Sequence, residues 1–251
     1  MSFSQAFTST SSSRSLFTTS PWISHSVLQL SQKTNQRRFP TVIFRDMSAG
    51  IKTRSNGVSV CGWGEGDTDY AHYHDTEWGM PVTDDVKLYE KMCLEGFQAG
   101  LSWLTILRKR ENFRVAFGGF EIEKVAGFGD QEVQELLNDS GIVRHRGKIE
   151  ATINNARAAV STIERYGSLA KFFWGFEPAN HRPAQKLSEV AAKTTESEHM
   201  SKELKKLGWR FVGPTTCYSL MQADGIVNDH LTQCFRHPEI EVARKVAKKS
   251  I

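Results

Sequence analysis

One carboxylate stands alone in the most apolar stretch of the sequence. The run from Met92 to Leu107 contains a single charged residue, Glu95, and charged residues close the run on both sides. This pattern predicts a buried segment. An ionised carboxylate is costly to bury unless hydrogen bonds or a counter-charge compensate. Glu95 is therefore either a structural group with a buried partner or a functional group in a pocket.

Two cysteines and two histidines have side chains of the types that bind zinc. His230 and Cys234 are four residues apart, so on a helical turn they face the same way and form half of a tetrahedral site. Cys61 and His74 could supply the other half and tie the first segment of the domain to its last. The spacing lacks the close pairs of a zinc finger, and isolated cysteines and histidines are commonly ordinary core or surface residues. Spacing alone leaves both interpretations open.

Aromatic residues gather near these groups: Trp63, Tyr70, Tyr73, Trp78, Phe97 and Trp103. Aromatic faces beside a carboxylate suit a flat, electron-poor or cationic ligand such as a nucleobase, through stacking and cation–π attraction. The simpler interpretation is that they are ordinary core aromatics.

Two basic clusters could contact a nucleic-acid backbone. The first covers residues 144–148 (RHRGK), and the second lies within residues 202–210, before the sequence FVGPTT. Gly213 and Thr215 of that sequence would open a helix whose backbone N–H groups face a phosphate, as in a helix-hairpin-helix. A solvated connection between two helices would show the same composition, and this alternative stays open.

The elements expected to position these residues are helices. Residues 83–85 provide an N-cap and an acidic first turn for a helix that should stop at Gly100, and Ser102 should cap the next helix. Glu95 would lie about one turn before the end of the first helix, and Trp103 in the first turn of the second. Further helices are expected over 121–127, 130–139, 146–165, 168–175, 187–192, 197–207 and 215–223.

Strand signals are weak, and the pattern predicts one all-α domain over residues 58–238. Residues 61–82 lack a helical period and are expected to form an ordered loop. Residues 239–251 are expected to be a basic tail ending in a solvated helix. No apolar run approaches the length of about 20 residues needed to span a bilayer, so no membrane partner is expected. The four cysteines have no repeating spacing, which favours free thiols or metal ligands over a disulfide framework.

The first 50 residues differ in composition from the rest of the chain. Residues 1–45 contain no Asp or Glu, are rich in Ser and Thr, and end in a basic stretch around Arg37 and Arg38. This is typical of a transit peptide, so we expect a disordered leader over 1–50 that directs the protein to the chloroplast or mitochondrion. The alternative is a tail without an address and a nuclear protein, and Met47 offers a second start. The net charge of +4 resides in this leader, so bulk charge gives no support to nucleic-acid binding.

Seven motifs then occur in a fixed order: CGWG, YHDTEWG, LEGFQAGLSW, KRENF, GIVRHRGKI, FVGPTTCYSLMQA and VNDH. Together, from Cys61 to about His237, they resemble the DNA-3-methyladenine glycosylase I family of the helix-hairpin-helix DNA glycosylase superfamily. The resemblance implies an all-α, monomeric enzyme of base excision repair. Such an enzyme flips 3-methyladenine out of double-stranded DNA and hydrolyses its N-glycosidic bond, leaving an abasic site.

The resemblance also assigns residues. It implies that Glu95 reads the flipped base while Tyr73 and Trp103 stack on it, and that Gly100 and Leu101 fill the gap left in the DNA. It further implies one structural zinc ion (Zn2+), held by Cys61, His74, His230 and Cys234. Residues 176–200 contain no motif of the family and are interpreted as a variable connection.

The implied chemistry is consistent with these residues. A base methylated at N3 carries a positive charge and is already a good leaving group, so the site must supply mainly recognition and an electrostatic bias. No lysine is an evident Schiff-base nucleophile, which favours a monofunctional enzyme. Whether Glu95 also acts as a general base stays open, as does the role of Asp229, the nearest acid after the hairpin.

Two other functions remain as alternatives. One is a non-catalytic, zinc-stabilised DNA-binding module in which Glu95 is structural. The other is a hydrolase with a catalytic zinc, which is disfavoured because four protein ligands leave no open position for water.

Overall fold

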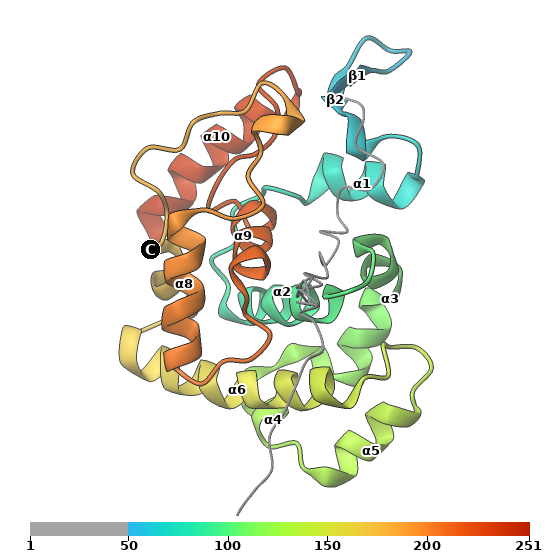
Figure 1. The fold of residues 1–251 in the computed structure, drawn as a ribbon, viewed down its shortest axis with the longest axis vertical. Helices are drawn as coiled ribbons and strands as arrows, with labels where there is room; N and C mark the ends of the chain where they lie inside the picture. The colour runs from blue at the N-terminus through green and yellow to red at the C-terminus, as the bar shows by residue number, and fades with distance from the viewer. Residues whose placement is uncertain (1–49) are drawn as a thin grey trace, which may run out of the picture. The chain divides into compact units, whose positions relative to one another are not determined.

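The computed structural model describes residues 50–251, so the leader expected over 1–50 lies outside the described residues except for Gly50. The described residues are mostly helical, which confirms the expected all-α class (Figure 1). None of their helices is long and apolar enough to cross a bilayer. The main helices are α1 (Thr68–Thr76), α2 (Asp85–Gln98), α3 (Trp103–Ala116), α4 (Ile122–Ala126), α5 (Asp130–Asn138), α6 (Arg146–Tyr166), α7 (Leu169–Trp174), α8 (Thr195–Lys206), α9 (Pro214–Ala223) and α10 (Arg236–Ala247).

Helix α2 lies at the centre and packs against α3, α6, α7 and α9 (Figure 1). Its side chains are buried without interruption from Leu88 to Gln98. It begins where the Asp84 carboxylate accepts the Lys87 N–H, and it ends before Gly100, whose φ of 84° favours glycine. The Ser102 hydroxyl then accepts the Thr105 N–H at the start of α3. The two helices expected on either side of Gly100 are confirmed.

Helix α1 corrects the expectation of a loop over residues 61–82. Its start is capped by the Asp67 carboxylate, which accepts the N–H groups of Asp69 and Tyr70. Only Tyr73 and His74 of this short helix are buried, so it shows no apolar period in the sequence. Before it, the strands β1 (Ile51–Thr53) and β2 (Ser59–Cys61) pair in antiparallel fashion, and the 3-10 helix η2 (Gly62–Gly64) follows.

The helix expected over 187–192 is wrong in extent. The structure has only a single 3-10 turn there, η4 (Leu187–Glu189), where the Glu189 carboxylate accepts the Gln185 and Lys186 N–H groups. The Glu189 side chain thus satisfies the free N–H groups at the start of the turn. None of the residues of η4 is buried, so packing does not extend the turn into an α-helix. The other expected helices are present, with ends that differ by a few residues. Two further 3-10 turns are η3 (Gly118–Phe120) and η5 (Lys248–Ser250).

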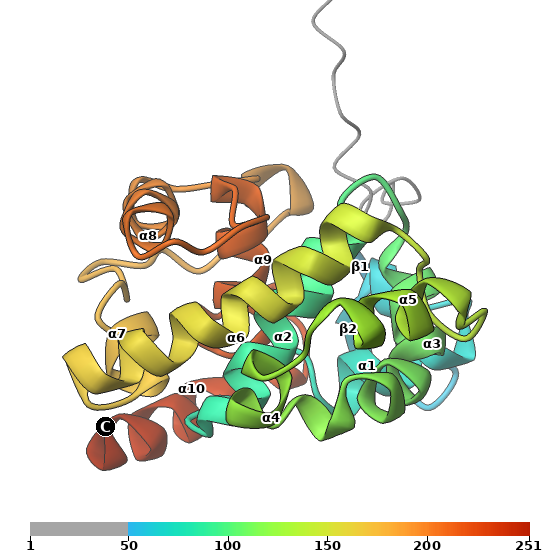
Figure 2. The ribbon, with the colours of Figure 1, turned by 90° about the horizontal axis from the view of Figure 1, so that it is seen from below.

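Helix α6 runs between two groups of helices, with α4 and α5 on one side and the α8–α9 hairpin on the other (Figure 2). Two of its asparagines secure the hairpin loop, because Asn154 donates to Gly208 O at 2.7 Å and Asn155 donates to Arg210 O at 2.9 Å. The hairpin is therefore held by specific polar contacts as well as by packing.

The C-terminal residues differ from the expected solvated tail, because they form most of α10 and pack on the domain. Ile240 and Arg244 are buried. The Arg244 guanidinium donates to Gly225 O at 2.8 Å and to Ile226 O at 2.7 Å, and it pairs with Glu177 at 2.6 Å. Basic composition alone hides this contact, since a long cationic side chain can be drawn inward by backbone carbonyls.

Replacing Arg244 by alanine should lower the free energy of unfolding by roughly 3 kcal/mol, because it leaves two buried carbonyls and Glu177 without their donor. Denaturant unfolding measures this difference. The exposed neighbour Lys245 is the matched control, and Lys245→Ala should change stability by less than about 0.5 kcal/mol. Equal, negligible effects of both substitutions would mean that α10 contributes no more than a solvated tail.

Candidate functional site

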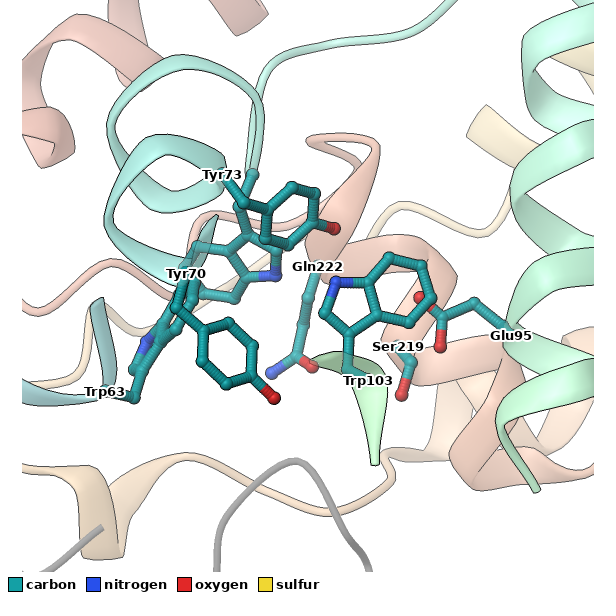
Figure 3. Close-up of a pocket in the computed structure, with 8 residues that line it drawn as sticks. Trp63, Tyr70, Tyr73, Glu95, Trp103, Ser219 and Gln222 are labelled. Atoms are coloured by element: carbon teal, nitrogen blue, oxygen red, sulfur yellow. The ribbon is translucent and has the colours of Figure 1, made fainter. Parts of the chain in front are cut away.

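A pocket lies where α1, α2, α3 and α9 meet (Figure 3). Its lining consists of Trp63, Tyr70, Tyr73, Trp78, Glu95, Trp103, Ser219 and Gln222. The structure thus brings together the three residues expected to bind a base, Tyr73, Glu95 and Trp103. Three of the other aromatic candidates also line the pocket, whereas Phe97 is buried in the core.

Ser219 and Gln222 are pocket residues that sequence reasoning missed. Both lie on α9, where every side chain from Cys217 to Ala223 is buried. Because α9 is buried on all its sides over these residues, the sequence carries no signal that separates pocket positions from core positions. Only the packing of α9 against α2 decides it.

Glu95 is buried in this pocket, with 5% of its surface exposed. Its Oε2 atom has no hydrogen-bond partner among residues 50–251. Burial raises the pKa of Glu95 to about 7, against the opposing positive charge of Lys91. The carboxylate is thus balanced between its two forms near neutral pH. A ligand that brings a positive charge or an N–H donor would shift that balance to the anion.

The aromatic pair Tyr73 and Trp103 borders the same space. Their ring centroids are 5.6 Å apart and the rings are tilted by 42°. Trp103 Nε1 is buried and has no acceptor among the described residues, so it too is available to a ligand. A flat base held between two rings needs a gap of about 7 Å, twice the usual contact distance. Stacking on both rings at once therefore requires that one of them moves outward.

Asp229 does not line the pocket. Its carboxylate accepts hydrogen bonds from Tyr218 at 2.8 Å and Gln222 at 2.7 Å, and it contacts His181 Nε2 at 3.0 Å. Burial opposes ionisation, but these partners outweigh it and lower the pKa of Asp229. Asp229 acts on the pocket through Gln222, whose amide it orients so that the oxygen is left as an acceptor. His181 comes from the segment interpreted as a variable connection, so that segment reaches the core.

The four expected metal ligands also come together. All four are buried, and their ligand atoms lie within 4.8 Å of one another. Cys61 Sγ is 3.8 Å from His230 Nδ1, while Cys234 Sγ is 3.6 Å from His230 Nδ1 and 3.5 Å from His74 Nε2. A tetrahedral zinc ion with the usual bond lengths separates its ligand atoms by about 3.3–3.8 Å. The three separations from Cys61 and Cys234 to the histidines lie within this range, as such an ion requires.

The surroundings of the cluster fit a metal as well. The second ring nitrogen of each histidine is engaged, because His74 Nδ1 contacts Asp75 Oδ1 at 2.7 Å and His230 Nε2 contacts Trp78 O at 2.9 Å. Such contacts fix the orientation of histidine ligands. Burial lowers the pKa of His230, which favours the neutral imidazole that a metal requires.

The cluster and the pocket share a wall. Trp63 packs edge-on against His74, with centroids 5.1 Å apart, and Trp78 packs in the same way against His230 at 4.6 Å. Both tryptophans line the pocket. The position of the aromatic wall thus depends on the residues of the cluster.

The residues expected to contact DNA are at least partly accessible. Gly100 is exposed and Leu101 half-buried in the turn between α2 and α3, and the amine of Lys148 fixes this turn by donating to Ala99 O at 2.6 Å. Gly213 caps α9 without a side-chain hydrogen bond, and Thr215 is exposed. The first N–H groups of α9 thus have no side-chain cap, as a phosphate-binding helix start requires.

Comparison with known proteins gives consistent results. The family model for methyladenine glycosylase matches residues 63–237. DNA-3-methyladenine glycosylase 1 of Escherichia coli (strain K12) is 50% identical over 182 residues, which are 71% of this chain and 96% of that protein. A crystal structure of 3-methyladenine DNA glycosylase I is 49% identical, with a TM-score of 0.68, over 71% of this chain and 100% of that one.

A further solved structure carries a ligand. It is a tyrosine-to-phenylalanine variant of a 3-methyladenine DNA glycosylase I in complex with 3-methyladenine, and it is 37% identical with a TM-score of 0.68 over 71% of this chain and 97% of that one. The family match covers most of the described residues, and the similarity extends over nearly the whole length of each relative. The chain therefore belongs to the methyladenine glycosylase family.

Proposed function

We propose that the chain is a monofunctional DNA glycosylase that excises 3-methyladenine from double-stranded DNA. The observation that carries this proposal is the buried Glu95 carboxylate with an unpartnered oxygen in an aromatic pocket. A cationic, flat base matches both features, because it pairs with the carboxylate and stacks on the rings. Membership of the family and the names of the relatives support the same substrate.

The reaction needs one water molecule. The bond between C1′ and the base breaks, its electron pair passes to the base, and the positive charge of the base is neutralised. Water adds to C1′ and loses one proton, which leaves an abasic site. Positive charge moves toward the sugar in the transition state, and the Glu95 carboxylate stabilises it there. Among the eight lining residues, Glu95 carries the one carboxylate that can also accept a proton from the water.

The remaining assignments concern the DNA and the base. Tyr73 and Trp103 stack on the flipped base. Gly100 and Leu101 enter the duplex at the gap that the base leaves, while Gly213 and Thr215 bind the backbone at the start of α9. The enzyme acts as a monomer on duplex DNA that carries alkylated bases.

The proposal includes one structural zinc ion, held by Cys61, His74, His230 and Cys234. Two thiolates and two imidazoles form a closed tetrahedral set, which leaves no position for a reacting water. The ion would contribute binding free energy to folding and would hold Trp63 and Trp78 in the wall of the pocket. Catalysis is left to Glu95 and the aromatic residues.

Replacing Glu95 by glutamine should lower the rate of 3-methyladenine release on the order of 100-fold while DNA binding persists, because the substitution removes charge but little volume. Release from alkylated duplex DNA is measured at several pH values. At DNA concentrations well below saturation, release by the wild type should rise as pH increases through about 7, where Glu95 of the free enzyme loses its proton, and in the variant this rise should be absent.

Glu90→Gln is the matched control, since Glu90 is a buried carboxylate of the same helix that pairs with Arg114 and does not line the pocket. It should retain release and its pH dependence. Full release by Glu95→Gln would contradict the assigned role, and binding of alkylated DNA without any release by the wild type would favour the non-catalytic module.

Zinc analysis of the purified protein should find about one equivalent per chain. Cys234→Ala should lose the metal and lower the melting temperature by about 10 °C, because the ion contributes directly to folding. Cys217→Ala removes another fully buried cysteine, outside the cluster, and should keep the metal. A wild-type protein without zinc, or a Cys234→Ala variant as stable as Cys217→Ala, would contradict the structural site.

The proposed destination is the chloroplast or mitochondrion, on the composition of residues 1–50. A fluorescent protein fused behind these residues should be imported into one of these organelles. The matched control is a fusion that begins at Met47 and so lacks most of the leader, and it should remain outside both organelles. A nuclear signal for the longer fusion would contradict the proposed destination.

A further inference from the structure

A buried lysine, Lys91, lies beside the pocket without lining it. Lys91 is on α2, one helical turn before Glu95, and only 7% of its surface is exposed. Its amine is 3.1 Å from the Tyr73 hydroxyl and 3.3 Å from Glu77 Oε1. It also lies 5.0 Å from the ring centroid of Tyr73 and 5.0 Å from that of Trp103. It thus contacts both rings that are proposed to bind the base.

The burial of the Lys91 ammonium group requires a physical explanation. A buried cation is unfavourable unless negative groups surround it, and a hydrophobic side chain would fill the same space without that penalty. The partner Glu77 is partly exposed and is shared with Arg110. The other carboxylates nearby, Glu95 and Asp224, are both buried, and each has an oxygen without a hydrogen-bond partner among residues 50–251.

The first consequence concerns Tyr73. Because an ammonium group can only donate, the hydroxyl oxygen of Tyr73 is the acceptor in this contact. The hydrogen of that hydroxyl is then free to be donated elsewhere.

The second consequence concerns Glu95. Burial favours its neutral form, and the charge of Lys91 is the influence that opposes burial. Burial acts on Lys91 as well, but the Tyr73 hydroxyl and the carboxyl groups of Asp224, Glu77 and Glu95 outweigh burial and raise its pKa, so it stays charged. Burial raises the pKa of Asp224 well above its usual range, and Glu77 has Arg110 as a second cation, so Glu95 is the carboxylate of this group that depends on Lys91.

Several charged and titratable groups lie on the elements packed around Glu95, and one of them, Glu90 of α2, pairs with Arg114 of α3. Lys91 is on α2, Tyr73 on α1, Glu77 just after it, Arg110 on α3, Asp224 at the end of α9 and Lys148 on α6. Arg110 pairs with Glu77, and the Lys148 amine donates to two backbone carbonyls at the end of α2. Lys91 is thus the cation of this group that is directed at the pocket side chains.

We infer that Lys91 is a positioning residue of the base pocket, which fixes the Tyr73 hydroxyl and provides the positive charge that stabilises the Glu95 carboxylate. The inference rests on the proposed function, because an anionic Glu95 matters for a cationic base. Lys91 touches no reacting atom, and it acts through the two residues that do.

The test is the pH dependence of 3-methyladenine release by Lys91→Met, which keeps the apolar part of the side chain and removes the charge. The midpoint of the rise in release, near pH 7 in the wild type, should move up by roughly 1–2 pH units. Release at pH 7 should fall about 10-fold and recover at pH 9, while the affinity for DNA stays within about 2-fold, since the pocket surface is unchanged.

Lys87→Met is the matched control, because Lys87 is an exposed lysine one turn earlier on the same helix. Its midpoint and its rate should equal those of the wild type. Lys91→Gln, a second uncharged variant that can still hydrogen-bond with Glu77, should show the same upward shift if Lys91→Met does not fold. A fall in release by the same factor at every pH, with an unchanged midpoint, would overturn the inference.

A direct titration separates this inference from the proposed function. Carboxyl carbon-13 NMR of glutamate-labelled protein reports the ionisation of Glu95, and the signal is assigned by its loss in Glu95→Gln. Its midpoint should rise in Lys91→Met whether or not the protein releases a base. A wild type that releases no 3-methyladenine would contradict the proposed function alone, and an unmoved Glu95 midpoint would contradict the role of Lys91 alone.

Discussion

The functional site is organised around the Glu95 carboxylate, which is held in a buried environment that disfavours its ionised form. Glu95 lies on the central helix α2, and its burial moves its pKa to about 7, so the anion exists only because other groups support it. A cationic base would supply part of that support when it binds. The pocket is thus more favourable to a positively charged base than to a neutral one, and this difference provides selectivity without an elaborate set of hydrogen bonds.

The surrounding helices keep this carboxylate in place. Helix α2 contacts α3, α6, α7 and α9, so its position is determined from several sides. Lys148 of α6 holds the end of α2 through two backbone carbonyls, and the two rings proposed to stack on the base, Tyr73 and Trp103, come from α1 and α3. A site built on packed helices is held more precisely than one on loops, which suits chemistry that depends on electrostatic arrangement.

The cluster of two cysteines and two histidines joins the first and last parts of the described domain. Cys61 and His74 come from the start of the described domain, and His230 and Cys234 come from the segment after α9. The two histidines of the cluster pack against Trp63 and Trp78, so the cluster also determines the position of the pocket wall. Asp229, next to His230, holds Gln222 of the pocket and His181 of the segment before α8. One short stretch therefore connects the cluster, the pocket and a connection that looked variable in sequence.

Much of this arrangement could be predicted, and the exceptions have physical causes. The break at Gly100 and the caps at Asp84 and Ser102 depend on local backbone chemistry, so they could be read from the order of the residues. Helix α1 could not, because its stability comes from packing of two side chains and from one capping aspartate. The burial of Arg244 was missed for a similar reason, since the carbonyls that bind it are distant in sequence.

By itself, the sequence determined the helical class, the isolation of Glu95 in an apolar run and the residue types of the cysteine–histidine cluster. These follow from composition and short-range order, in which each residue is judged against its neighbours. Only the tertiary structure decided which aromatic residues face Glu95, that Ser219 and Gln222 join them, and that Lys91 lies beside them. The reason is that a pocket forms where helices far apart in sequence meet, and the ionisation of a buried group depends on every charge that those helices bring to it.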